Sequence, residues 1–418
     1  MEKKLFERIL KGVLASFYGQ GVTLAFQFLS VPIFISNWGV EKYGEWVLLF
    51  AIPSSIAMLE LGFFSIIGNK ISIFLEKEDY KEASSIVNTI SLFFLALILI
   101  VIFFQVIFSI ISDAVLVLIY YSILFLWSNF TVSVFRADRM FHVGSFVSTT
   151  ARLFESIIAI VVIYLGYDIY QVALTYLYCR FISVLSIYFY MNFKLSWYNK
   201  LSFNKGSIST TDLKNTFNYS LMPLGFLINN QVIIFLINYL FGSATLALFS
   251  VLRTYFRVIN QFVTAITNSS WQEVNFLCNR YEYDKSFSLL YKISKLTTIL
   301  IVVISVLFYS ISDSVLNFWT KGTIIAPESI KIAMLLSVAL FSFWQPFHMF
   351  LGASNNYKVH SKIYLLLQLV GISFLYVFSP TLESSIYFIT FLELVMIVSI
   401  LFVTFAFKSK LLRINHEI

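Results

Sequence analysis

The chain has 418 residues, of which 59% are hydrophobic and only 12% are charged, and its formal net charge is +7. Soluble globular domains carry about 25% charged residues, so this composition excludes a soluble protein and predicts a polytopic membrane protein. The apolar runs recur along the whole chain, which leaves no stretch for a separate soluble domain. The two cysteines, Cys179 and Cys278, predict neither a disulfide scaffold nor a metal site.

Twelve membrane-spanning helices, and therefore an all-α fold, are predicted from windows of about 19 residues. Helices are favoured over a membrane barrel because the apolar runs are long and continuous and do not alternate. The first run follows a basic head without a small-x-small cleavage site, which favours a retained span over a removed signal peptide. The expected spans are 13–35, 44–68, 86–110, 114–136, 143–165, 169–193, 216–241, 245–270, 289–311, 329–352, 360–380 and 384–407.

Positive charges gather in alternate connections between these spans. Lys70, Lys77 and Lys81 follow the second span, and Lys285 and Lys292 follow the eighth, whereas the intervening connections hold few lysines or arginines. Lysine and arginine accumulate in short cytoplasmic loops. The pattern therefore predicts that both termini are cytoplasmic, and it explains the net charge without a nucleic-acid partner.

The chain also contains a weak internal repeat. The segment "FSIISDAVL" at 108–116 returns as "FYSISDSVL" at 308–316, each time after a long apolar run. Six spans per half keep the same orientation, so the repeat predicts a parallel duplication with the substrate site between the halves. The expected parts are an N-terminal lobe at 1–198, a cytoplasmic inter-lobe loop at 199–214 and a C-terminal lobe at 215–418.

Two predicted spans carry a polar stripe on one helical face. The stripes have spacings of three and four residues. In the eighth span the stripe is Ser250, Arg253, Arg257, Gln261, Thr264 and Asn268, and in the first it is Ser16, Gln20, Thr23, Gln27 and Ser30. Lipid cannot satisfy such donors, so each stripe either contacts other helices or lines a water-filled cavity.

Arg253 and Arg257 stand out because like charges at i, i+4 repel each other and a central arginine is costly in a membrane. Two further intramembrane cations are expected: Arg152 and Arg180. Three intramembrane carboxylates are available for charge balance or ion coupling: Glu60, Glu155 and Glu393. Arg152 and Glu155, at i, i+3, could pair with each other. The remaining cations predict a cavity for an anionic group such as phosphate, which arginine binds through a planar fork of donors.

Several enzyme signatures are absent. The sequence has no phosphate-binding glycine loop, no His-Glu-x-x-His and no paired acids in a long loop, which argues against an ATPase or a metal hydrolase. No cofactor is expected. The longest predicted external loop, at 312–328, leaves no room for the catalytic loop that sugar-chain polymerases and ligases generally carry.

The segments "VPIFISNWGVEKYGEWVLLF" at 31–50 and "LELGFFSIIGN" at 59–69 carry a family resemblance. They resemble the bacterial polysaccharide flippases, which are the O-antigen (Wzx-type) exporters of the multidrug, oligosaccharidyl-lipid and polysaccharide export superfamily. The matching positions are Pro32, Gly39, Tyr43, Gly44, Trp46, Glu60, Gly62 and Phe63. Family members often have aspartate at the position of Glu60, and beyond the first 70 residues the sequence is divergent.

The resemblance implies two six-helix lobes around a central cleft in the bacterial cytoplasmic membrane. It implies alternating access for an undecaprenyl-diphosphate-linked oligosaccharide, with Arg253, Arg257, Arg152 and Arg180 on the head group, and a polysaccharide polymerase and a chain-length regulator as partners. Other readings stay open. A cation-coupled drug exporter generally has a carboxylate in the first span, where this chain has only glutamines, and a peptidoglycan-precursor flippase generally has more than twelve helices.

Overall fold

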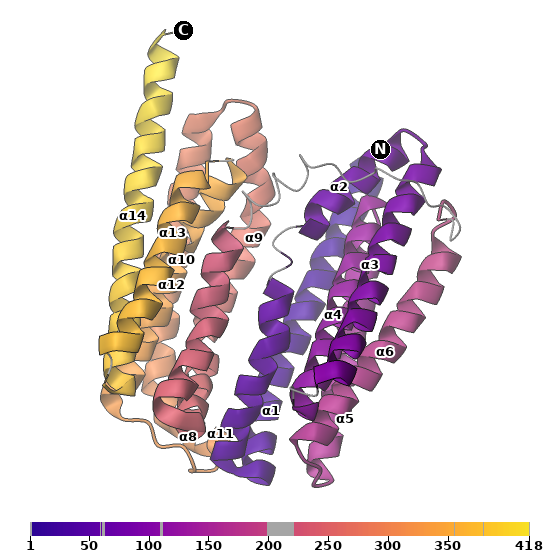
Figure 1. The fold of residues 1–418 in the computed structure, drawn as a ribbon. Coiled ribbons are helices and arrows are strands. Elements are labelled where there is room, and N and C mark those ends of the chain that lie inside the picture. The colour runs from indigo at the N-terminus through magenta and orange to yellow at the C-terminus, as the bar shows by residue number, and fades with distance from the viewer. Residues whose placement is uncertain are drawn as a thin grey trace. The chain divides into compact units, whose positions relative to one another are not determined.

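Long helices make up the protein in a computed structural model that describes residues 2–58, 60, 63–108, 112–198, 221–354, 356–378 and 380–417 (Figure 1). These residues contain no β-strand, so the all-α prediction is confirmed. The elements are α1 (Glu2–Met58), α2 (Phe63–Glu76), α3 (Tyr80–Phe108), α4 (Asp113–Ala137), α5 (Phe141–Tyr164), α6 (Ile169–Lys194), η1 (Ile228–Val232), α8 (Ile233–Phe256), α9 (Val258–Asn279), α10 (Tyr283–Ser310), α11 (Ser312–Thr320), α12 (Glu328–Ala353), α13 (Lys358–Phe378) and α14 (Leu382–Glu417).

Ten helical stretches of the described residues are long and apolar enough to cross a membrane. Two of them, Tyr18–Met58 and Leu221–Phe256, are far longer than the roughly 20 residues that one crossing needs. Each contains a glycine with a positive φ, Gly39 (φ 80°, ψ 173°) and Gly242 (φ 80°, ψ 171°), in a backbone conformation that is essentially restricted to glycine. The break divides each stretch into two helical segments, and the same local break in both halves agrees with the predicted repeat.

Two predicted boundaries are wrong. The second span, predicted at 44–68, ends with α1 at Met58, and α2 begins only at Phe63 after a turn in which the Phe63 N–H donates to the Glu60 carbonyl (2.8 Å). The predicted loop 312–328 contains the short helix α11. Averaging hydropathy over a window hides a turn between two apolar segments, and it also hides a helix as short as α11.

The chain divides into two compact units. The first unit is Met1–Gly39 with Leu48–Pro223, and the second is Val40–Val47 with Leu224–Ile418. The predicted inter-lobe loop at 199–214 lies outside the described residues, so the limits of the lobes stay a prediction.

In the first unit, α4 is the central helix and packs against α2, α3, α5 and α6. Its core includes Phe64, Phe94 and Phe130, whose rings contact one another. In the second unit, α12 is central and packs against α8, α9, α10 and α14. In both units the central helix carries buried hydroxyls, such as Ser122 and Ser342, that donate to the carbonyl four residues earlier and so need no partner outside the helix.

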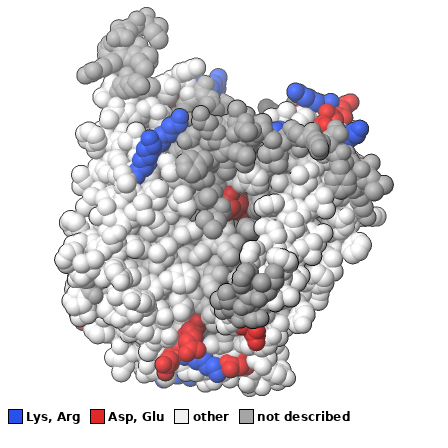
Figure 2. Space-filling view, in the orientation of Figure 1, with Lys and Arg blue, Asp and Glu red and all other residues white. Residues whose placement is uncertain are grey.

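The outward faces of the helices are apolar. Large side chains such as Phe103, Val106, Phe193, Val306 and Phe402 are more than half exposed. Figure 2 shows that the charged side chains lie mostly toward the ends of the helices, with a largely uncharged surface between them. Such a surface is unfavourable in water and compatible with lipid, which fits membrane-spanning helices.

Candidate anion-binding site

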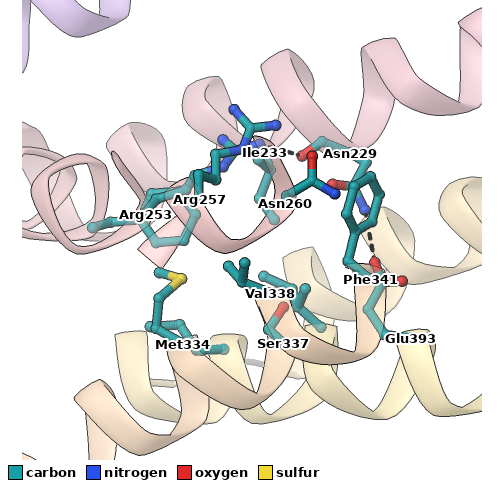
Figure 3. Close-up of a pocket in the computed structure, with 13 residues that line it drawn as sticks. Asn229, Ile233, Arg253, Arg257, Asn260, Met334, Ser337, Val338, Phe341 and Glu393 are labelled. Carbon is teal, nitrogen blue, oxygen red and sulfur yellow. Dashed lines mark hydrogen bonds between the residues drawn. The ribbon is translucent and has the colours of Figure 1, made fainter. Parts of the chain in front are cut away.

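The eighth-span arginines face a cavity inside the second unit. The cavity is about 40 Å³ and lies between α8, α9, α12 and α14 (Figure 3). Arg253 comes from the last turn of α8, and Arg257 follows that helix directly. The polar lining is completed by Asn229, Asn260, Ser337 and Glu393. A cavity of this size holds one or a few waters, and both arginines are partly buried.

Both arginines bind a distorted turn of the preceding span. Arg253 donates to the carbonyls of Asn229 (3.0 Å) and Asn230 (3.0 Å) and to the Asn230 side-chain oxygen (2.9 Å). Arg257 donates to the same Asn230 oxygen. Both asparagines belong to η1, a π-helical turn in which the Ile233 N–H bonds five residues back to the Ile228 carbonyl. A π-helical turn disturbs the carbonyl ladder, and the guanidinium donors satisfy the carbonyls that it exposes.

Neither arginine forms an ion pair with a carboxylate of the described residues. The ion pairs among the described residues, with a nitrogen and a carboxylate oxygen within 4.0 Å of each other, include neither Arg253 nor Arg257. Their hydrogen-bond acceptors are neutral amide oxygens. Two adjacent cations with neutral acceptors would gain from an anionic oxygen, because charge-assisted hydrogen bonds are about twice as strong as neutral ones.

Glu393 of α14 lines the same cavity but is held by other groups. It is 2% exposed, and its two oxygens accept from the Trp344 indole (2.8 Å) and the Asn229 amide (3.2 Å). The Asn229 amide also lies 3.4 Å from the Gln368 side-chain oxygen. The predicted residues Arg253, Arg257 and Glu393 are therefore brought together in one cavity.

The first unit contains a second buried charge cluster. The Arg180 guanidinium of α6 lies 2.6 Å from a Glu155 oxygen of α5, and both side chains are fully buried. Arg180 also donates to Ser128 and Tyr121 and lies over the Phe125 ring. The suggested pairing of Glu155 with Arg152 is not formed, because packing of α5 against α6 places Arg180 on the carboxylate. Arg152 lies over Phe125, 5.9 Å from the ring centroid.

The other predicted site residues are not among the residues that line the arginine cavity. Gln20 and Gln27 are partly exposed on α1, and Gln261 and Thr264 are partly exposed on α9 without lining the cavity. Thr264 approaches the Asn260 side chain at 3.3 Å. Glu60 lies in the turn after α1, with Asn129 as a side-chain hydrogen-bond partner.

Sequence reasoning missed the groups that hold the arginines. Asn229, Asn230 and Gln231 are three consecutive amides inside an otherwise apolar run, "LGFLINNQVIIFLI". The apolar residues on both sides keep the mean hydropathy of the window high, so the run predicts only a span. Trp344 was missed because its indole donor is indistinguishable from an apolar ring in a hydropathy window.

No protein-family model matches the chain, and no curated protein matches it significantly by sequence. Solved structures do match. The chain has the fold of a MOP superfamily transporter. An inward-facing multidrug resistance MATE family transporter of the MOP superfamily superposes with a TM-score of 0.70 at 16% identity, covering 93% of this chain and 96% of that one.

Two further structures of the same fold extend the comparison. The outward-facing form of a multidrug resistance MATE family transporter gives a TM-score of 0.66 at 16% identity over 97% of this chain and 96% of that one. A MOP superfamily transporter from Pyrococcus furiosus, described as having a binding pocket of reversed polarity, gives 0.61 at 15% identity over 97% of this chain and 96% of that one. The predicted fold class, an all-α polytopic membrane protein with two lobes, is thereby confirmed.

Proposed function

We propose that the protein is a flippase that moves an undecaprenyl-diphosphate-linked oligosaccharide across the bacterial cytoplasmic membrane by alternating access. The oligosaccharide would be an O-antigen or capsule repeat unit. The observation that carries the proposal is the pair Arg253 and Arg257, which faces a cavity of the second unit without a carboxylate among its hydrogen-bond acceptors. The fold supports a transporter, and the resemblance of residues 31–50 and 59–69 supports this substrate class.

The diphosphate is the part of the substrate that the arginines would bind. Its oxygens accept the parallel donors of a guanidinium fork, and arginine stays charged in a membrane interior. The polyprenyl tail would remain in lipid, which the apolar outer faces of the helices allow. The cavity of about 40 Å³ is too small for a diphosphate and a sugar, so entry of the head group requires the cavity to open, as alternating access provides.

Glu393 is the favoured coupling carboxylate among the three that the sequence offers. It lines the arginine cavity and forms no ion pair among the described residues, whereas Glu155 is committed to Arg180 and Glu60 lies in a turn. Neutralisation of Glu393 by a proton or a cation would change the charge of the cavity between two conformations. The proposed setting has both termini in the cytoplasm, with a polysaccharide polymerase and a chain-length regulator acting on the product.

The proposal is tested by lipid analysis of cells that lack this protein but keep the glycosyltransferases. We expect completed diphosphate-linked oligosaccharides to accumulate on the cytoplasmic side, and wild-type protein to reverse this while the Arg253→Ala/Arg257→Ala variant does not. If oligosaccharides reach the external face but remain single units, the protein is a polymerase and the proposal is wrong.

A cation-coupled small-molecule exporter is the second candidate, because MATE family multidrug transporters share the fold. The two candidates differ in the charge of their cargo. A cavity that presents two arginines disfavours cationic drugs and favours anions. Efflux of a cationic dye that persists in the Arg253→Ala/Arg257→Ala variant would favour the exporter, and dye efflux no greater than in cells without the protein would favour the flippase.

A further inference from the structure

One residue of the π-helical turn connects the arginines to the buried carboxylate. The carbonyl of Asn229 accepts from Arg253 (3.0 Å), while the side-chain amide of the same residue donates to Glu393 (3.2 Å) (Figure 3). We propose that Asn229 is a coupling residue, through which an anion on Arg253 and Arg257 and the charge of Glu393 influence each other. This inference rests on the proposed function, because it assumes an anionic ligand on the arginine pair.

Some of the five N–H donors of each arginine are already in use when no anion is bound. Arg253 makes three hydrogen bonds to η1, and Arg257 makes one to the same asparagine side chain. An anion that takes the donors now bonded to η1 replaces these amide oxygens, a replacement that the stronger charge-assisted bonds favour. Binding therefore removes the donors that satisfy the carbonyls of Asn229 and Asn230.

The carbonyls of a π-helical turn that loses its external donors can be satisfied again by N–H groups of the helix itself. Reversion to ordinary α-helical bonding pairs each carbonyl with an N–H four residues later, but it shifts the register of the turn by one residue. A one-residue shift rotates side chains by about 100° around the helix axis, which would move the Asn229 amide away from Glu393. The carboxylate would then keep only the Trp344 donor.

The position of Asn229 in the second unit fits this role. Asn229 and Glu393 line both the arginine cavity and a neighbouring cavity of about 10 Å³ that also contacts Gln368 and Gly371. The pair therefore forms part of the wall between the two cavities. A rearrangement at Asn229 would change the lining of both cavities. The anion on the arginines and the charge of Glu393 would then act on one shared structural element, as thermodynamic coupling requires.

A double-mutant cycle on the purified full-length protein in detergent tests the inference. The dissociation constant of inorganic pyrophosphate is measured by calorimetry for wild type, Glu393→Gln, Asn229→Leu and the double variant. We expect Glu393→Gln to change the constant by about fivefold or more in the wild-type background and by less than about twofold with Asn229→Leu. The same factor in both backgrounds would mean direct charge interaction and would overturn the role of Asn229.

Asn260→Leu is the matched control, because Asn260 lines the same cavity and is bonded to Ser342 and Thr264 instead of Glu393. With this change, the effect of Glu393→Gln on the dissociation constant should stay near its size in the wild-type background.

If Asn229→Leu does not purify as a folded protein, hydrogen exchange of the wild-type protein is measured instead of the double-mutant cycle. Pyrophosphate should alter exchange several-fold in residues 228–234, and unchanged exchange at saturating pyrophosphate would overturn the inference.

The outcomes separate this inference from the proposed function. Pyrophosphate binding that is equal in wild type and in Arg253→Ala/Arg257→Ala would overturn the anion site, and the coupling role of Asn229 with it. Arginine-dependent binding combined with equal Glu393→Gln factors would overturn the coupling role alone.

Discussion

Each unit holds arginines among apolar helices, but the hydrogen-bond and ion-pair partners of these arginines differ between the two units. In the first unit, Arg180 is fully buried and bound to Glu155 at 2.6 Å, with further contacts to Tyr121 and Ser128. In the second unit, Arg253 and Arg257 are bound to the amide oxygens of η1 and face a cavity. In the first unit the carboxylate is bound directly to Arg180, with Arg152 nearby over Phe125, whereas in the second unit Glu393 lines the same cavity as the two arginines but forms no ion pair with either among the described residues.

An intramembrane arginine is therefore not by itself evidence for a ligand site. What matters is whether a carboxylate compensates the charge. Arg180 has such a partner, so its burial is explained by structure alone, although a buried pair adds little net stability. Arg253 and Arg257 form no ion pair among the described residues and line one cavity together, and this is why we assign the anion to the second unit.

The largest expected effect comes from breaking the Glu155–Arg180 pair. Arg180→Met leaves the Glu155 carboxylate buried without a cation, which should destabilise the protein by about 3–5 kcal/mol. The Glu155→Leu/Arg180→Met variant should recover most of that loss, since it removes both charges. Thermal unfolding in detergent measures both. A double variant that is stable but inactive in transport would show that the Glu155–Arg180 pair also serves transport.

The next largest effect is expected for Arg253 and Arg257, which have no ion-pair partner among the described residues. Arg253→Ala/Arg257→Ala removes two charged hydrogen-bond partners of the head group at about 1.5–3 kcal/mol each, so transport should fall by about 100-fold or more while membrane insertion persists. Transport is measured at matched protein level. Arg253→Lys/Arg257→Lys keeps the charge and loses the fork, and should retain intermediate transport. Full transport by the double alanine variant would contradict the phosphate-binding role.

A smaller effect on stability is expected for Trp344, whose indole donates to Glu393. Trp344→Phe removes one hydrogen bond to a charged group and should cost about 1.5–3 kcal/mol. The matched control is Trp127→Phe in the first unit, whose ring stacks on Phe94 and for which the described residues record no hydrogen bond. The unfolding midpoint should fall clearly more for Trp344→Phe. Equal shifts would mean that ring size alone, and not the bond to Glu393, matters.

The smallest effect compares the twin breaks in the two units. Gly39→Ala and Gly242→Ala place a side chain in a backbone conformation that is essentially restricted to glycine, and each should cost about 1–3 kcal/mol. Neither substitution meets a neighbour within 4 Å, so the cost would be backbone strain. Gly21→Ala, within the same α1 helix and also free of close neighbours, should be neutral or stabilising by about 0.5–1 kcal/mol. If Gly39→Ala and Gly242→Ala have the same unfolding midpoint as Gly21→Ala, the expected backbone strain is absent.

Much of the fold could be predicted from local patterns. The third to sixth spans differ from α3, α4, α5 and α6 by only a few residues at most ends. The failures occurred where a local pattern is ambiguous. The second span ends at Met58 instead of residue 68, and the predicted loop after α10 contains α11. α11 is held by an ion pair of Asp313 with Lys331 of α12, a contact between residues 18 positions apart.

The candidate site was predicted in part. Arg253 and Arg257 could be selected because two charges in an apolar run are costly, which is a property of the sequence. Their acceptors, Asn229 and Asn230, could not be assigned, because the contacts depend on a π-helical turn 23 to 27 residues earlier in the chain. Neither hydropathy nor helical periodicity encodes the register of such a turn.

The sequence by itself determined the class of protein, the approximate spans and the presence of unusual intramembrane cations, because hydrophobicity and helical periodicity are local properties. Only the tertiary structure decided which charges cancel. Glu155 binds Arg180 of the neighbouring helix and not Arg152 three residues away, and Glu393 binds Trp344 and Asn229 and no arginine. The partner of a buried charge depends on helix packing, since groups a few ångströms apart in space come from distant parts of the chain.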